Sequence, residues 1–164
     1  MKQVFIQTKK NILMSCLALA TSFMFFGCTK SDVSVSLMYS ISGNANSSQV
    51  TPAPTTNNSN GSGTMSGSYN SSTKVMTYTS TWASLTGAPI AGAFYSGASA
   101  GAVGSLVGTW SLGSGLTASG SFSGSVKLNA DQETQLLAGK CYYLFSTTAN
   151  ASGEIRGQIK ASAQ

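Results

Sequence analysis

The 164-residue chain is predicted to fold as an all-β domain. Apolar and polar side chains alternate over short stretches, as expected for strands with one buried face. Turns rich in Gly, Ser and Asn separate these stretches at short intervals. Only residues 130–138 have a helical composition, with Asp131 and Glu133 ahead of two leucines. Short alternating strands divided by such turns favour a β-sandwich or a β-barrel.

The expected elements follow one another from residue 33 onward. The sequence of residues 33–38 is Val-Ser-Val-Ser-Leu-Met, an alternation that indicates the first strand. Residues 42–63 are rich in Asn, Ser, Thr, Pro and Gly, and Pro52 and Pro54 exclude a regular helix there. A long polar loop is therefore expected. Seven further strands are expected over residues 64–69, 74–82, 90–95, 106–112, 119–128, 140–147 and 154–160.

The segment 74–82 shows the strand alternation most clearly. Met76, Tyr78 and Trp82 share one face. The opposite face carries Thr77, Thr79 and Thr81. Aromatic residues on alternating strands usually bury their large area, so most of them are expected in the core. These aromatic residues are Tyr78, Trp82, Trp110, Phe122 and Tyr142.

The N-terminal residues 1–27 have the three parts of a secretory signal. Three lysines lie in the first ten residues, an apolar stretch covers residues 12–26, and Gly27 precedes Cys28. The apolar stretch is shorter than the roughly 20 residues that a membrane-spanning helix needs. The sequence Phe-Phe-Gly-Cys at residues 25–28 resembles a bacterial lipobox, which implies that Cys28 is lipidated. The alternative is an uncleaved anchor in which Cys28 is an ordinary thiol.

The net charge of +5 does not indicate a nucleic-acid-binding protein. Three of the five excess positive charges lie in the signal sequence, because after cleavage before Cys28 six basic and four acidic residues leave a net charge of +2. No stripe of Lys or Arg remains that could follow a phosphate backbone. We therefore expect a membrane contact through the lipid anchor, an envelope protein or glycan as a further partner, and no nucleic acid.

The chain contains few residues suited to catalysis or metal binding. The chain contains no histidine, which removes the commonest general base and metal ligand. Without it no Ser–His–Asp triad can form. Cys141 is the one cysteine that remains after Cys16 and Cys28 are assigned to export and lipidation, and we expect it to be a buried, inert thiol. No enzymatic activity, metal or cofactor is expected.

The segment Gly153-Glu-Ile-Arg-Gly-Gln158 is the most distinctive motif. Glu154, Arg156 and Gln158 should share one strand face, with the intervening isoleucines pointing inward. Gly153 and Gly157 would permit a tight approach or a bulge. Glu154 and Arg156 could form a surface ion pair, or the Arg156 guanidinium could clamp carbonyl groups of a neighbouring loop. We favour this structural role over ligand binding.

This motif closely resembles the closing motif of the CHRD domain, a family first named from chordin. The preceding strand 142–147, the opening segment Ser42-Gly-Asn44 with its following prolines, and the strand from Met76 occur in the family's order. The likeness covers about residues 35–161. The family carries a His-x-His pair and a further His, which fall here at Phe94, Ser96 and Ser146. All three positions lack histidine, so a metal cannot be held there in that way.

Together these features predict an all-β Greek-key β-sandwich of immunoglobulin-like architecture with seven to eight strands. Residues 1–27 would be the lipoprotein signal, 28–34 the lipidated cysteine and tether, and 35–164 the domain. The expected function is a non-catalytic binding or scaffold domain in the cell envelope, anchored to a bacterial membrane, by preference the outer one. The alternative is a degenerate ligand-binding or enzymatic module. Its site would lie around Phe94, Ser96 and Ser146, with Ser96 and Ser146 facing each other as a small polar patch.

Overall fold

The computed structural model describes residues 37–53 and 59–164. The predicted signal, Cys28 and the tether lie outside the described residues. Within them, eight strands accompany one α-helix, α2 (Ala130–Leu137), and one short 3-10 helix, η1 (Ser47–Gln49). The strands are β1 (Met38–Asn46), β2 (Ser62–Asn70), β3 (Val75–Ala83), β4 (Pro89–Ser96), β5 (Ser105–Trp110), β6 (Gly120–Lys127), β7 (Cys141–Thr147) and β8 (Ile155–Ala163).

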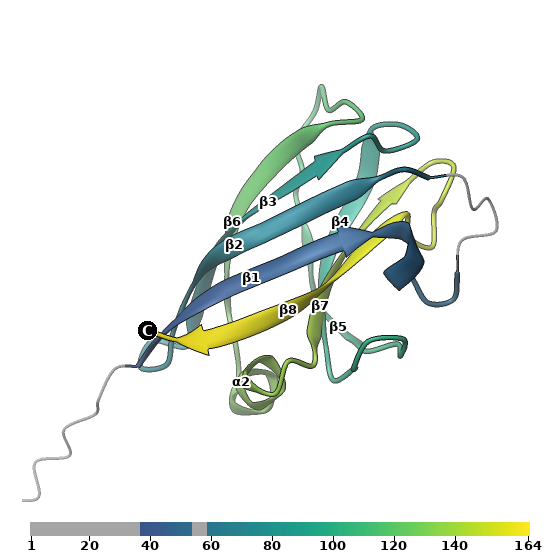
Figure 1. The fold of residues 1–164 in the computed structure, drawn as a ribbon. Helices are drawn as coiled ribbons and strands as arrows, with labels where there is room; N and C mark the ends of the chain where they lie inside the picture. Colours follow the sequence, from purple (N-terminus) through teal and green to yellow (C-terminus); the bar gives the residue numbers. More distant parts are fainter. Residues whose placement is uncertain (1–36, 54–58) are drawn as a thin grey trace, which may run out of the picture. The chain divides into compact units, whose positions relative to one another are not determined.

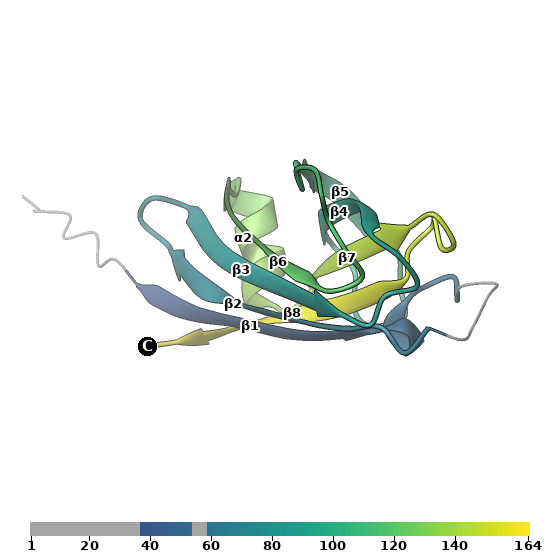
Figure 2. The ribbon, with the colours of Figure 1, turned by 90° about the horizontal axis from the view of Figure 1, so that it is seen from above.

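All eight described strands belong to one antiparallel sheet, in the order β5-β4-β7-β8-β1-β2-β3-β6 (Figure 1). The sheet curls until its two edges approach each other, so that Trp110 of β5 stacks on Phe122 of β6 at a ring-centroid distance of 5.4 Å. Figure 2 shows β4, β5 and β7 facing β1, β2 and β3 across the interior. The prediction of an all-β, sandwich-like fold is confirmed, with a single nearly closed sheet forming both layers.

The inward side chains form one aromatic-rich core. Tyr78, Trp82 and Trp110 are buried in it, and Phe122 packs against it. Tyr142 is also buried, but it belongs to a small second cluster with Ala98 and Leu144 on the other side of β7. The expectation of a core role therefore holds for all five aromatic residues, with Tyr142 serving the outer cluster.

The first strand lies further along the chain than the alternation predicts. β1 extends to Asn46, so the loop predicted over residues 42–63 was wrong at both ends. The sequence is misleading because residue 43 is a glycine in a strand interior. A Cβ there would lie 2.8 Å from the carbonyl oxygen of Gln158 and 3.3 Å from the Tyr143 ring. Glycine at this position lets β1 lie between β2 and β8 despite its weak strand propensity.

The other predicted elements are confirmed, with ends that shift by no more than about three residues. The helix begins with a capping box. The Asn129 side chain accepts a hydrogen bond from the Gln132 backbone N–H, and the Gln132 side chain accepts one from the Asn129 backbone N–H. Leu136 is its fully buried residue and joins the core at one end of the curled sheet. In the part of the chain that the structure describes, no helix has the length and hydrophobicity needed to cross a bilayer.

Candidate functional site

The structure does not bring the predicted ligand patch together. Phe94 is 1% exposed and belongs to the core. Ser96 pairs with Cys141, whereas Ser146 lies five residues further along β7, roughly 16 Å away at the usual rise per residue. Cys141 faces the core, so Ser96 opposite it does so too, while Ser146 follows the inward Phe145 and points to the outer side. The strand register therefore excludes the polar patch that the alternative function needs.

Glu154 is the centre of a buried hydrogen-bond cluster. Its side chain is fully buried, and four donors reach its two carboxylate oxygens. The Ser59 hydroxyl donates to Oε1 at 2.6 Å and the Thr86 amide donates to the same atom at 2.7 Å. The Thr86 hydroxyl donates to Oε2 at 2.6 Å, and the Thr147 hydroxyl donates to Oε2 as well. One carboxylate thus ties together the segment before β2, the segment after β3 and the end of β7.

These hydrogen bonds also set the ionisation of Glu154. Burial by itself would raise the pKa of the carboxyl group, but the bonds from Ser59, Thr147 and Thr86 favour the charged form and hold its pKa below the usual value. The carboxylate therefore stays ionised at neutral pH with its lone pairs occupied. It is not free to act as a general base.

Arg156 is the second buried charge of the motif and clamps a loop. The side chain is 1% exposed. Nη1 donates to the carbonyl of Ala102 at 2.6 Å, and Nη2 donates to that of Ser99 at 3.2 Å. Its guanidinium carbon lies 3.6 Å from the centre of the Tyr142 ring, which stacks in turn on Tyr95. The planar guanidinium thus fixes the loop between β4 and β5 onto the outer side of the sheet.

The surface ion pair between Glu154 and Arg156 was a wrong expectation. Both side chains are buried, and among the described residues the ion pair found is Lys74 with Glu133 at 2.6 Å. Glu154 and Arg156 instead form hydrogen bonds with different groups of the chain. Gln158 continues the clamp, because its Nε2 donates to Ala98 and Gly139 carbonyls, both at 2.8 Å.

The motif glycines make room for the β7 side chains beside them. A Cβ on Gly157 would lie 2.5 Å from Tyr143 Cε1. Gly153 has a φ of +133°, and a Cβ there would lie 2.7 Å from Leu144 Cδ1. These contacts explain why the motif contains glycine at both positions.

Cys141 is a buried thiol, as expected. It is fully buried, and desolvation raises its pKa to about 12. The nucleophilic thiolate is therefore scarce at neutral pH. Within the described part of the chain, no group of three His, Cys, Asp or Glu side chains is arranged to hold a metal ion.

The outward face of four neighbouring strands carries an ordered array of hydroxyl groups that the sequence only hinted at. Three rows run across β1, β2, β3 and β6 in register, and we call them the hydroxyl face. The rows are Ser40–Ser68–Thr77–Ser125, Ser42–Ser66–Thr79–Ser123 and Asn44–Thr64–Thr81–Ser121. Eleven of these twelve side chains carry a hydroxyl group, and all but the half-buried Ser68 are exposed. The alternating threonines of residues 77–81 were the visible signal.

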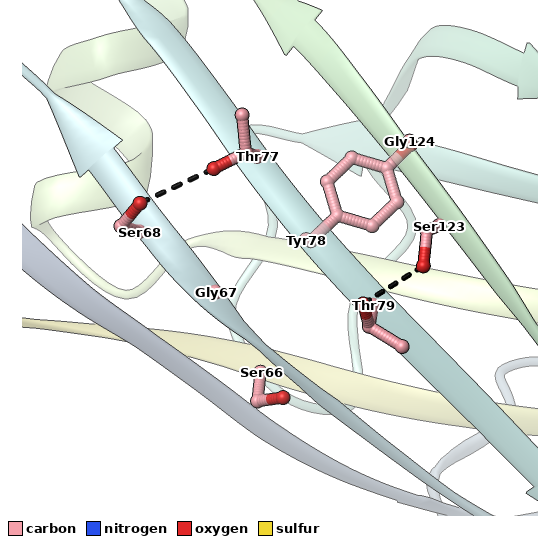
Figure 3. Close-up of a pocket in the computed structure, with 8 residues that line it drawn as sticks. All are labelled: Ser66, Gly67, Ser68, Thr77, Tyr78, Thr79, Ser123 and Gly124. Carbon is pink, nitrogen blue, oxygen red and sulfur yellow. Dashed lines mark hydrogen bonds between the residues drawn. The ribbon is translucent and has the colours of Figure 1, made fainter.

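Neighbouring hydroxyls on this face bond to each other across the strands. Thr79 and Ser123 are 2.8 Å apart, and Ser68 and Thr77 are 3.2 Å apart (Figure 3). A shallow hollow of about 430 Å³ lies over these residues. In Figure 1 the strands of this face lie in front, and no other described element crosses them.

Comparison with known families identifies the domain. The family model of the CHRD domain matches residues 41–159, which is most of the chain. The chain belongs to the CHRD domain family. The match begins in β1 and ends in β8, so it includes the buried motif of Glu154 and Arg156. No curated protein and no solved structure matches the chain.

Proposed function

We propose that this CHRD domain protein is a bacterial lipoprotein, exported and held at the cell envelope by a lipid on Cys28. Its domain then binds or spaces a partner without catalysis, on the outer membrane and facing either the periplasm or the outside. The signal-like residues 1–27 and the Phe-Phe-Gly-Cys sequence support export and lipidation. Several acyl chains on one cysteine give stable anchoring, at about 0.8 kcal/mol for each buried CH₂ group.

One observation supports the non-catalytic role above all others. The charged groups of the family motif are buried and bonded to the chain itself, Glu154 to three hydroxyls and an amide, and Arg156 to two loop carbonyls. Groups used in this way hold loops on the sheet and are themselves not exposed to a substrate at the surface. The exposed hydroxyl face is ordered by hydrogen bonds between its own side chains, which suits binding rather than catalysis.

Labelling with an alkyne analogue of palmitate tests the anchor. The full chain, expressed in a bacterium, should incorporate the label and fractionate with the envelope. A Cys28→Ser variant should lose the label and be released. Cys16→Ser is the matched control, because it removes a thiol from the signal sequence and should leave labelling intact. Equal labelling of Cys28→Ser and the unchanged protein would refute the anchor.

A further inference from the structure

We propose that the hydroxyl face, together with Lys160, binds a strand of acidic polysaccharide whose sugar rings bear carboxylate groups. This inference rests on the proposed non-catalytic binding role and names the partner for it. The middle row of the hydroxyl face, Ser42 to Ser123, continues into β8, because Lys160 pairs with Ser42 in the β1–β8 register. A line of five side chains thus crosses five strands, a span of about 19 Å at the usual strand spacing.

The Lys160 end of this line is a second hollow with a built polar lining. Its volume is about 300 Å³, and it is lined by Ser42, Gly43, Asn44, Gln49, Gln158 and Lys160. Gln158 is held from two sides, since its amide donates to the Ala98 and Gly139 carbonyls. The Gln158 backbone donates to Gln49 Oε1 at 3.3 Å, and Gln49 Nε2 donates to the Asn44 carbonyl at 2.9 Å. The wall beside Lys160 is thus fixed before any ligand arrives.

The two hollows are neighbours along the middle row. The hollow at Lys160 ends at Ser42, and the hollow of Figure 3 begins at Ser66, which is the residue paired with Ser42. An extended chain could therefore occupy both without a break. The shallow hollow over the hydroxyl face suits a polymer that lies along the surface better than a small ligand, which usually needs a deeper pocket.

The chemistry of the face suits sugar hydroxyls. Serine and threonine hydroxyls both donate and accept hydrogen bonds, as sugar hydroxyls do. Short side chains also lose little rotamer freedom when a ligand orders them. None of the twelve side chains of the hydroxyl face is aromatic or large and apolar, and Tyr78, which also lines the hollow, is buried in the core. The exposed face therefore lacks the anchors typical of protein–protein interfaces.

Charge complementarity selects an acidic polymer. Lys160 lies at one end of the middle row. The exposed Lys127 is the last residue of β6 and lies on the same strand face as Ser121, Ser123 and Ser125. The acidic residues of the described part lie elsewhere: Asp131 and Glu133 are in the first turn of α2, and Glu154 is buried. Two separated cations can pair with sugar carboxylates but are too few for the phosphate backbone of a nucleic acid. Binding should therefore be weak at each site and sensitive to salt.

Retention of the full chain on immobilised polysaccharide tests this proposal. The detergent-solubilised protein would be passed over alginate, a polyuronate, and over dextran, a neutral glucan. We expect retention on alginate that decreases as the salt rises through about 0.15 M, where the Debye length is about 8 Å, and no retention on dextran. Equal retention on both columns, or release from alginate by competing DNA or by added envelope protein, would overturn the proposal.

Two variants with matched controls locate the site. Thr77→Val/Thr79→Val/Thr81→Val removes three hydroxyls while keeping side-chain shape, and should weaken alginate binding by about 2- to 10-fold for each lost hydrogen bond. Thr109→Val, on the exposed side of β5, should bind normally.

Lys160→Gln should lower both affinity and salt sensitivity, whereas Lys140→Gln should not. Thermal unfolding checks that each variant is folded. Unchanged binding by Lys160→Gln would refute the site even if the threonine variant did not fold. Equal palmitate labelling of Cys28→Ser and the unchanged protein would refute the anchor alone, because the column does not depend on it.

Discussion

Replacing Glu154 by glutamine separates the charge of this side chain from its shape. The carboxylate accepts four hydrogen bonds from Ser59, Thr86 and Thr147. The glutamine amide keeps one acceptor oxygen for Ser59 and the Thr86 amide. Its NH₂ group cannot accept from the two threonine hydroxyls, which would have to turn and accept instead. Bonds to charged groups contribute about 1.5–3 kcal/mol each. The loss of two of them, partly restored in reverse, should lower the free energy of unfolding by about 2–4 kcal/mol.

Urea denaturation at several pH values measures this effect. Because the folded-state pKa of Glu154 is held below its unfolded value, its contribution is fully present above the unfolded pKa, near 4.3, and is lost as the pH falls through the folded pKa. The Glu154→Gln curve should therefore approach that of the unchanged protein in acid. Asp131→Asn, an exposed control in the first turn of α2, should lower the free energy of unfolding by no more than about 1 kcal/mol. A neutral-pH cost for Glu154→Gln as small as that of the control would refute the reasoning.

Two further substitutions test the rest of the motif. Arg156→Lys should lower the unfolding free energy by about 2–4 kcal/mol, because a single ammonium group cannot hold two loop carbonyls and stack on a ring. Proteolysis should then cleave the loop between β4 and β5 faster. An unchanged cleavage rate would count against the clamp. Gly157→Ala should cost about 1–3 kcal/mol, since the new Cβ would meet the Tyr143 ring at 2.5 Å. Gly108→Ala, with open space around its Cβ, should leave the free energy of unfolding unchanged or raise it by up to about 1 kcal/mol. Thermal unfolding compares the two glycine variants.

Local pattern was enough to locate most of the fold. The alternation around Tyr78 and Trp82 assigned both the strand and its buried face, because side-chain direction in a strand has a period of two. The helix after Asn129 was equally visible, since its cap and first turn are encoded in consecutive residues. β1 was misplaced because small polar residues and Gly43 form a strand only when both neighbours supply hydrogen bonds.

The candidate site was less accessible to the same reasoning. The proposed meeting of Ser96 and Ser146 failed because the β4–β7 register, which no local pattern reveals, separates them along the strand and places them on opposite sides. The structural role favoured for Arg156 agrees with its bonds to the loop carbonyls, but its tyrosine partner could not be foreseen.

The sequence by itself determined the fold class, which strand residues face the core, and the burial of Cys141. These depend on residue type and on spacing along the chain. Only the tertiary structure decided that Ser59, 95 residues before Glu154, donates to that carboxylate, and that hydroxyls from four strands align in three rows. The physical reason is the same in both cases. Strand pairing joins segments far apart in the chain, and its register follows from the whole sheet closing over one core.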